Sequence, residues 1–232
     1  MPPDLTLTHI FAAIFLLVAW FGHALILRLF ASGTLNSQLN MVRRQWISQV
    51  TRREGNPYDA ILLGHTVNSA AFFGSATLLV LAGVISLLAN LDATHVTLTK
   101  LPMISNVSIE FFALEVMFVT TVLAISFFTF TYTLRKLIYT VVLIGGLPRE
   151  SDNHPEQDRL VESTATVLGE AIKSFNFGIR GYYYAAAALF MFISPIACVI
   201  ATLVMAAVLF YRQLATRTST AMHDYVKALG NG

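Results

Sequence analysis

The residues best suited to metal binding or nucleophilic chemistry are few in this 232-residue chain: six histidines and one cysteine. No two histidines stand three or four positions apart, so no single helical turn presents two imidazoles to one metal ion. Cys198, the single cysteine, lies inside an apolar run and can form no disulfide within the chain. The sequence also contains no Walker loop, no HExxH and no GxSxG motif. It therefore predicts no catalytic residue, no metal site and a protein that is not an enzyme.

Polar side chains do gather where long apolar runs begin and end. His23 lies near the end of the first run, and His65 lies near the start of the second. Antiparallel helices would place both imidazoles at similar depth, together with polar residues from two further runs. Ionisable groups at membrane depth are costly and mark functional positions. We therefore predict one polar layer on the cytoplasmic side of a helical bundle, made of His23, His65, Asn68, Arg135, Tyr139, Asn176, Arg180 and Tyr183.

Three interpretations of this layer stay open. In the first, hydrogen bonds between its side chains fix the register of the helices, and no cofactor is bound. In the second, Arg135 and Arg180 attract a small anion, and the layer is the cytoplasmic mouth of its site or pathway. In the third, His23 and His65 ligate the iron of a b-type haem from facing helices.

The composition of the chain defines the environment of these residues. Hydrophobic residues make up 56% of the chain, charged residues make up 12%, and the mean hydropathy is +0.66. Because a soluble domain carries about 25% charged residues, this chain is expected to be an integral membrane protein with the lipid bilayer as its partner. The net charge of +2 is too small to indicate a nucleic-acid partner.

Four apolar segments reach the about 20 residues that a membrane-spanning helix needs. Because a helix satisfies its own backbone in lipid, the sequence predicts an all-α bundle with four transmembrane helices, forming a single membrane domain over residues 1–232. The fourth segment contains Ser194 and Pro195. We predict a straight or Pro-kinked span there, with a re-entrant hairpin as the alternative. The predicted spans are residues 9–30, 61–91, 111–134 with an extension to 144, and 182–211.

The basic residues predict the orientation of the chain. Residues 31–58 and 148–180 are rich in arginine and lysine, whereas residues 1–27 contain neither. The positive-inside rule then places both loops in the cytoplasm and the N-terminus outside the inner (plasma) membrane. Four spans would also place the C-terminus outside, although the tail carries Arg212, Arg217 and Lys227.

Each cytoplasmic loop contains an amphipathic helix, predicted over residues 36–54 and 155–178. In the first, Leu39, Val42 and Trp46 recur on one face. The second shows a similar apolar stripe from Leu160 to Phe175. We expect both helices to lie on the membrane or on the bundle, with docking of a partner protein as the alternative.

The second span carries small and polar residues on two neighbouring faces. Small residues let helix backbones approach closely, and polar ones bond across the contact. We therefore predict that this span is the central helix of the bundle, with little lipid contact. The residues assigned to this packing are Gly64, Ala71, Gly74 and Ser75, which share the two faces with Asn68, Ala82, Ser86, Ala70 and Thr77.

Glu115 is the one carboxylate inside an apolar run. It lies near the outer end of the third span. We expect it to be solvated or paired near the membrane interface, and a proton-relay role is the alternative.

Four stretches give the chain a family resemblance: "RRQW", "DAILLGHTVNSAAFFGSATLLVLAGVISLL", "FTYTLRKLIYTVVLIGGLP" and "NFGIRGYYYAAAALFMFISP". They resemble a family of bacterial and plant four-span membrane proteins that is catalogued only as a domain of unknown function. The resemblance covers about residues 15–215, and its most specific part is the Asn-x-Gly-x-Arg-x-Tyr-Tyr segment. It implies four spans and no substrate, cofactor or catalytic residue.

These observations predict a non-enzymatic membrane protein that acts as an oligomeric scaffold or as an accessory subunit of a larger membrane complex. Its partners would be copies of itself or other membrane subunits. The alternatives are a channel or transporter for a small anion or other solute, and a b-type haem-binding membrane protein.

Overall fold

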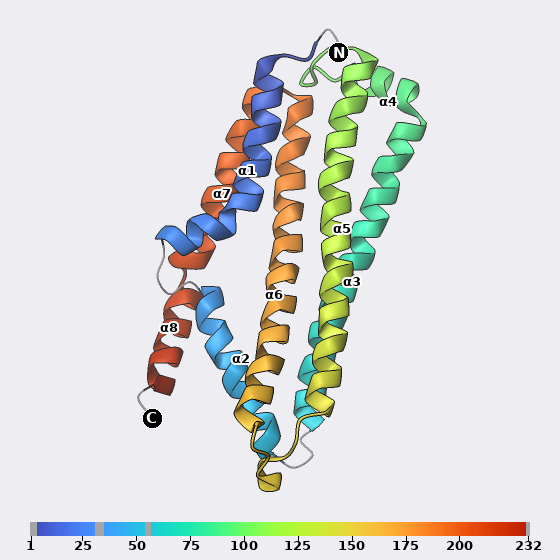
Figure 1. The fold of residues 1–232 in the computed structure, drawn as a ribbon. Coiled ribbons are helices and arrows are strands. Elements are labelled where there is room, and N and C mark those ends of the chain that lie inside the picture. The colour runs from blue at the N-terminus through green and yellow to red at the C-terminus, as the bar shows by residue number, and fades with distance from the viewer. Residues whose placement is uncertain (1–3, 31–34, 54–56, 231–232) are drawn as a thin grey trace. The chain divides into compact units, whose positions relative to one another are not determined.

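The structure is a computed structural model that describes residues 4–30, 35–53 and 57–230, all of whose regular elements are helical (Figure 1). This confirms the all-α fold class. The elements are α1 (Leu7–Phe30), α2 (Leu35–Arg52), α3 (Pro57–Ala89), α4 (Leu91–Leu98), α5 (Ile109–Gly145), the 3₁₀ turn η1 (Glu150–Asp152), α6 (Gln157–Ala188), the 3₁₀ turn η2 (Leu189–Phe192), α7 (Pro195–Leu214) and α8 (Arg217–Gly230).

Four stretches of the described chain are helical, long and apolar enough to cross a membrane. They are Leu7–Leu27, Pro57–Ala89, Ile109–Gly145 and Pro195–Leu229. The last of these covers α7 and α8. The prediction of four apolar helices of membrane length is therefore confirmed, and the chain has the form of a multi-pass membrane protein.

The boundaries of the predicted fourth span, residues 182–211, are wrong. Residues 182–188 belong to α6, a 32-residue helix that also contains most of the predicted amphipathic helix 155–178. After η2 the chain starts the separate helix α7 at Pro195. The Ser194 hydroxyl accepts a hydrogen bond from the Ala197 backbone N–H at 3.0 Å. Because serine caps helix N-termini and proline favours the first helical position, this pair ends one helix and begins the next.

Contacts divide the chain into two compact units. Unit 1 contains Met1–Phe30, Ser75–Phe128 and Gly178–Phe210. Unit 2 contains Ala31–Gly74, Thr129–Phe177 and Tyr211–Gly232. Helices α3, α5 and α6 each contribute residues to both units.

One end of unit 1 is defined by three contacts. The Ser108 N–H donates to the Asp4 carboxylate at 2.7 Å, and the Ser105 N–H donates to the Phe192 carbonyl at 3.0 Å. The ring of His9 meets that of Phe111 at a centroid distance of 4.7 Å. The start of α1, the start of α5 and the turn after α6 therefore lie together. Within unit 1, α6 runs toward this end and α7 runs away from it, beside α1 (Figure 1).

The core of unit 2 is apolar and draws on four helices. Its buried residues are Ile47, Ala70, Leu137, Val161, Ala165, Leu168 and Ala171. Both predicted amphipathic helices pack here: α2 contributes Ile47, and α6 contributes the last four of these residues. Of the predicted stripes, Leu168 and Ala171 are in the cluster, and Trp46, Ile172 and Phe175 are partly buried against it. Ion pairs then join α2 to its neighbours: Arg44 meets Glu162 at 2.7 Å, and Arg52 meets Glu150 at 2.8 Å. The two helices therefore pack on the bundle, as one of the two interpretations expected.

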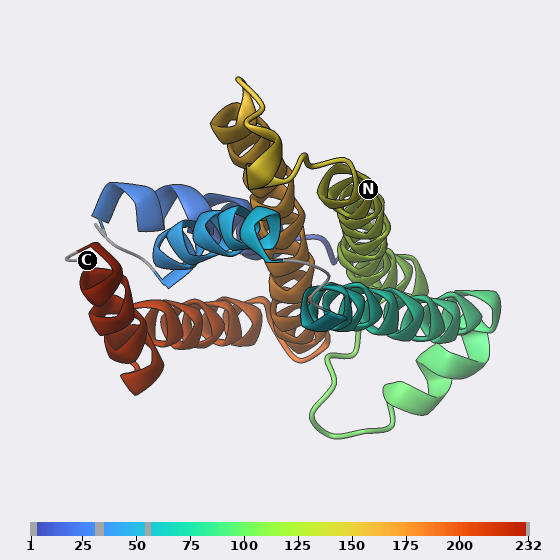
Figure 2. The ribbon, with the colours of Figure 1, turned by 90° about the horizontal axis from the view of Figure 1, so that it is seen from below.

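The prediction that the second span is the central helix is wrong. Only 11% of the most apolar window of α3 is buried. In both views α3 runs beside α5 (Figures 1 and 2), and the buried residues of α3 are Leu63, Ala70, Gly74 and Thr77. The other small-residue face stays exposed at Asn68 and Ser75. Periodicity identified both faces but did not show which of them meets the rest of the chain.

Candidate functional site

In unit 1, α6 contacts three other helices. A Cβ atom added to Gly181 would overlap the Ser126 hydroxyl of α5 and lie 2.9 Å from the Trp20 ring of α1. One residue on, the Tyr182 and Thr77 hydroxyls form a short hydrogen bond that links α6 to α3. Gly181 therefore lets α6 approach its neighbours closely, as small residues do in membrane bundles.

This close approach places Arg180 beside His23, within electrostatic range. The His23 side chain is 1% exposed, and its ring lies 4.5 Å from that of Phe210 on α7. The Tyr184 hydroxyl, one turn after Arg180, donates to the Ala19 carbonyl of α1 at 3.2 Å. The His23 Nδ1 atom is buried and forms no hydrogen bond with the described residues. A cationic, donor-rich cluster thus lies inside unit 1, and its two central members were both predicted from the sequence.

The other predicted members of the polar layer are placed differently. His65, Asn68, Arg135 and Tyr139 belong to unit 2 and have exposed or half-buried side chains. Asn176 is half-buried in unit 2, and Tyr183 is half-buried in unit 1. The structure therefore brings His23 and Arg180 together, and the grouping of all eight residues stays a prediction.

The residues assigned to helix packing also divide. Gly74 is buried, and a Cβ atom there would lie 3.7 Å from Phe130 of α5. Gly64 has open space around its Cα, Ala71 is half-buried and Ser75 is exposed. Gly74 therefore packs within the chain, whereas Gly64 and Ser75 lie on the uncovered face.

Sequence reasoning missed Lys136 and its contacts in unit 2. Its ammonium donates to the Ser174 hydroxyl at 2.8 Å and lies 4.5 Å from the centre of the Tyr132 ring. The signal was available, because Lys136 stands four positions after Tyr132 on one helix, and residues so spaced are neighbours. The cation–π contact positions the ammonium, and the hydrogen bond holds α5 against α6.

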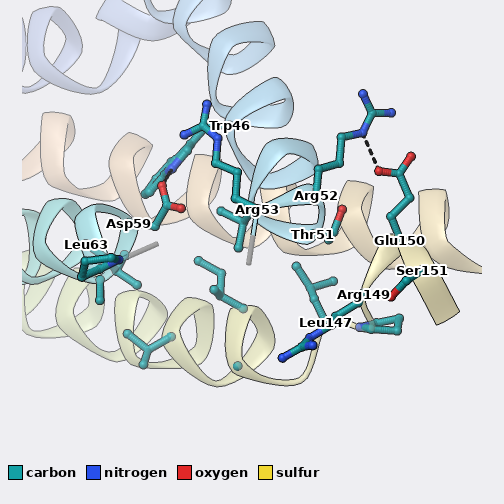
Figure 3. Close-up of a pocket in the computed structure, with 17 residues that line it drawn as sticks. Trp46, Thr51, Arg52, Arg53, Asp59, Leu63, Leu147, Arg149, Glu150 and Ser151 are labelled. Carbon is teal, nitrogen blue, oxygen red and sulfur yellow. Dashed lines mark hydrogen bonds and ion pairs between the residues drawn. The ribbon is translucent and has the colours of Figure 1, made fainter. Parts of the chain in front are cut away.

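Sequence reasoning also missed a pocket of about 830 Å³ in unit 2 (Figure 3). Its walls come from the end of α2, the start of α3 and the end of α5 with the turn that follows. Trp46 donates from Nε1 to the Asp59 carboxylate at 2.7 Å, which fixes α2 to the first turn of α3. Arg52, Arg53 and Arg149 supply positive charge, and Leu63, Val141, Ile144 and Leu147 supply apolar surface.

The charges of this pocket are only partly paired. Figure 3 shows Arg52 turned to Glu150, the 2.8 Å ion pair already named. Arg53 and Arg149 point away from this pair in the same view. Neither guanidinium forms an ion pair with a residue that the structure describes. The pocket therefore presents two arginines beside an apolar wall.

Metal-ligating side chains do not converge in the described ranges, where no group of three His, Cys, Asp or Glu residues is placed to hold an ion. Arginine, histidine and tyrosine around an apolar interior suit hydrogen bonding and charge stabilisation.

A bundle with four apolar helices of membrane length and a buried polar cluster defines a multi-pass helical membrane protein. Residues 10–218 match the family model DUF599, described as a protein of unknown function. The match covers most of the sequence, so the chain belongs to the DUF599 family, in agreement with the resemblance noted above. No curated protein matches the chain, and no solved structure matches it.

Proposed function

We propose that this protein is a non-enzymatic membrane subunit that assembles with further copies of itself through the exposed face of α3. The proposal rests on one observation: Asn68 exposes its amide on a helix of membrane length, between small residues. This amide forms no hydrogen bond with the described part of the chain. A polar group that faces lipid is costly, whereas the same group at a helix contact finds a partner.

The chemistry of the amide favours a second copy as that partner. An asparagine side chain is both donor and acceptor, so two copies related by a two-fold axis can satisfy each other. The residues on the same face are small, which permits close approach of two α3 helices. They are Gly64, Ala71, Ser75, Ala82 and Ser86.

The mass of the gently extracted protein tests this proposal. We expect native mass spectrometry to give an integer multiple of the 25.5 kDa chain. Asn68→Leu and Ala82→Leu should each shift the protein toward the single chain. Val80→Leu is the matched control, because Val80 is 46% exposed on another face of α3. A single chain in the wild type would contradict self-assembly, and bound polypeptides of other mass would indicate an accessory subunit instead.

We also propose an orientation in which α6 is a further crossing and the C-terminus is cytoplasmic. Only Arg28, Lys100 and Arg180 of the fifteen lysines and arginines lie in unit 1. Arg212, Arg217 and Lys227 of the tail lie in unit 2 with the basic loops. The tail helix α8 packs on α2, where Gln38 bonds to His223 at 3.0 Å. A cytoplasmic tail would bring these basic residues into agreement with the positive-inside rule.

Reporter fusions test the orientation. A fluorescent protein fused at the C-terminus should fold and fluoresce, and alkaline phosphatase fused there should be inactive. Alkaline phosphatase fused after Lys100 is the control and should be active, because the proposed orientation puts that loop outside. An active phosphatase at the C-terminus would contradict the proposed orientation.

The pocket of unit 2 favours a second candidate function, the binding of a small anion. We infer that Arg53 and Arg149 would bind the anion while the apolar wall holds any attached carbon chain. Titration with inorganic phosphate at constant ionic strength should change the fluorescence of Trp46, which lines the pocket. Arg149→Gln should remove the response and Arg217→Gln, on α8, should keep it. An equal response in both variants would contradict this candidate.

A further inference from the structure

Glu115 lies in the interior of unit 1, whereas the sequence predicted a solvated or paired carboxylate near the membrane interface. Its side chain is 6% exposed. On α5 it is preceded by the buried rings of Phe111 and Phe112 and followed by buried Val116 and Val119. Apolar side chains therefore surround the carboxyl along its own helix.

Polar groups face Glu115 from α7. Cys198 lies within electrostatic range of the carboxyl and beside Thr202, and both side chains are 0% exposed. The Thr202 hydroxyl oxygen forms no hydrogen bond with a described nitrogen or oxygen atom. From the other elements, His9 contacts Phe111 and His95 contacts Phe112, the residues one turn before Glu115. Two histidines thus stand between this carboxyl and the end of unit 1 that holds Asp4.

Among the residues that the structure describes, no cation is paired with Glu115 to balance a negative charge. Glu115 forms no ion pair or hydrogen bond with the residues that the structure describes. A buried carboxylate without a partner costs so much free energy that the group takes up a proton instead. The neutral acid can then donate a hydrogen bond to a hydroxyl or thiol across the α5–α7 contact.

We propose that Glu115 is a proton-binding site of the membrane bundle, held neutral at neutral pH and open to proton exchange through the end of unit 1 where His9 and His95 lie. On release, the carboxyl O–H bond breaks and the proton passes to water. On binding, the carboxylate takes the proton back. The site is independent of self-assembly through α3, because it lies between α5 and α7.

Carbodiimide labelling tests this proposal, because dicyclohexylcarbodiimide from the lipid phase adds to protonated carboxyls. We expect one adduct per chain at neutral pH, mapped to Glu115 by peptide mass. Glu115→Gln should lose the adduct. Glu110→Gln is the matched control, because Glu110 lies on the same helix in the less buried first turn, and it should keep the adduct. Absence of a Glu115 adduct in folded wild-type protein would overturn the proposal.

Two further measurements distinguish a proton site from a sodium site and from a permanently ionised carboxylate. Replacing K⁺ by Na⁺ at constant ionic strength should leave the labelling rate unchanged, and protection by Na⁺ would overturn the assignment to a proton. Infrared spectra of the Glu110→Gln variant should show the carbonyl band of a protonated carboxylic acid at neutral pH, and Glu115→Gln should lose it. A band that persists in Glu115→Gln, or its absence from Glu110→Gln, would overturn the proposal.

Discussion

Unit 2 buries an apolar cluster and pairs its charges at the surface, whereas unit 1 buries His23 and Glu115 among apolar helices. In water, apolar groups gain from burial and charges gain from exposure. In lipid, ionisable side chains are more stable inside the bundle than on the lipid-facing surface. The two units therefore place ionisable side chains differently: unit 2 pairs them at its surface, whereas unit 1 buries His23 and Glu115.

The largest expected effect is in the packing of unit 1. Gly181→Leu should abolish the folded state, because even its Cβ atom would overlap Ser126 and crowd Trp20. Overpacking a filled site costs about 1–3 kcal/mol for a few methylenes, and here the backbones themselves must separate. Size-exclusion profiles in mild detergent measure the loss. Gly83→Ala, where no atom lies within 4 Å of the added Cβ, should behave as wild type.

The core of unit 2 should respond strongly to the loss of a buried side chain. Leu137 is 1% exposed, and Leu137→Ala should lower the free energy of unfolding by about 3 kcal/mol. The neighbouring Ile138 is 57% exposed, so Ile138→Ala should cost about 0.5 kcal/mol or less. Denaturant titrations of the two variants give both values. Equal losses would show that the buried cluster does not stabilise unit 2.

The ion pairs of unit 2 should contribute little. Arg52 and Glu150 are both 53% exposed, so Glu150→Gln should change stability by about 0.5 kcal/mol or less. The small difference should vanish at high salt, because exposed charges are screened. Thermal unfolding at two salt concentrations measures it. A large effect that is independent of salt would mean that this pair behaves like a buried one.

The smallest effect is expected for Asp4, at the end of unit 1 where it accepts a hydrogen bond from Ser108. Hydrogen bonds from Ser108 lower the pKa of Asp4 below its usual 3.8. The resulting stabilisation is therefore fully present above about pH 4 and is lost as the pH falls through the lowered pKa. Asp4→Asn should unfold at a lower temperature than wild type near neutral pH and at the same temperature in strong acid. If the two unfolding temperatures still differed in strong acid, the stabilisation would not come from the ionised Asp4 carboxylate.

The sequence predicted the helices that are long and strongly apolar. The runs of α1, α3 and α5 are long and strongly apolar on average, so hydropathy located them within a few residues. Hydropathy did not locate the end of α6. This helix packs on three neighbouring helices, and it can therefore carry Arg180 and several tyrosines among its apolar residues. The Ser194–Pro195 pair did hold the signal for a new helix, yet length alone argued against a hairpin of two short halves.

The site was predictable only in part, for a related reason. His23 and Arg180 were found because charge inside an apolar run is conspicuous. The pocket was not, because its walls come from three segments that only the fold assembles. Glu115 was visible in the sequence, but its position near Cys198 of α7 comes only from the fold.

The bond between Gln38 and His223 joins residues 185 positions apart. During synthesis at about 5–20 residues per second, α2 is complete roughly 10–40 s before its partner on α8 exists. The contact between α2 and α8 therefore cannot form until α8 has left the ribosome. Truncation near the C-terminus removes the partner of α2 as well as a tail, and the timing of translation becomes part of how this protein folds.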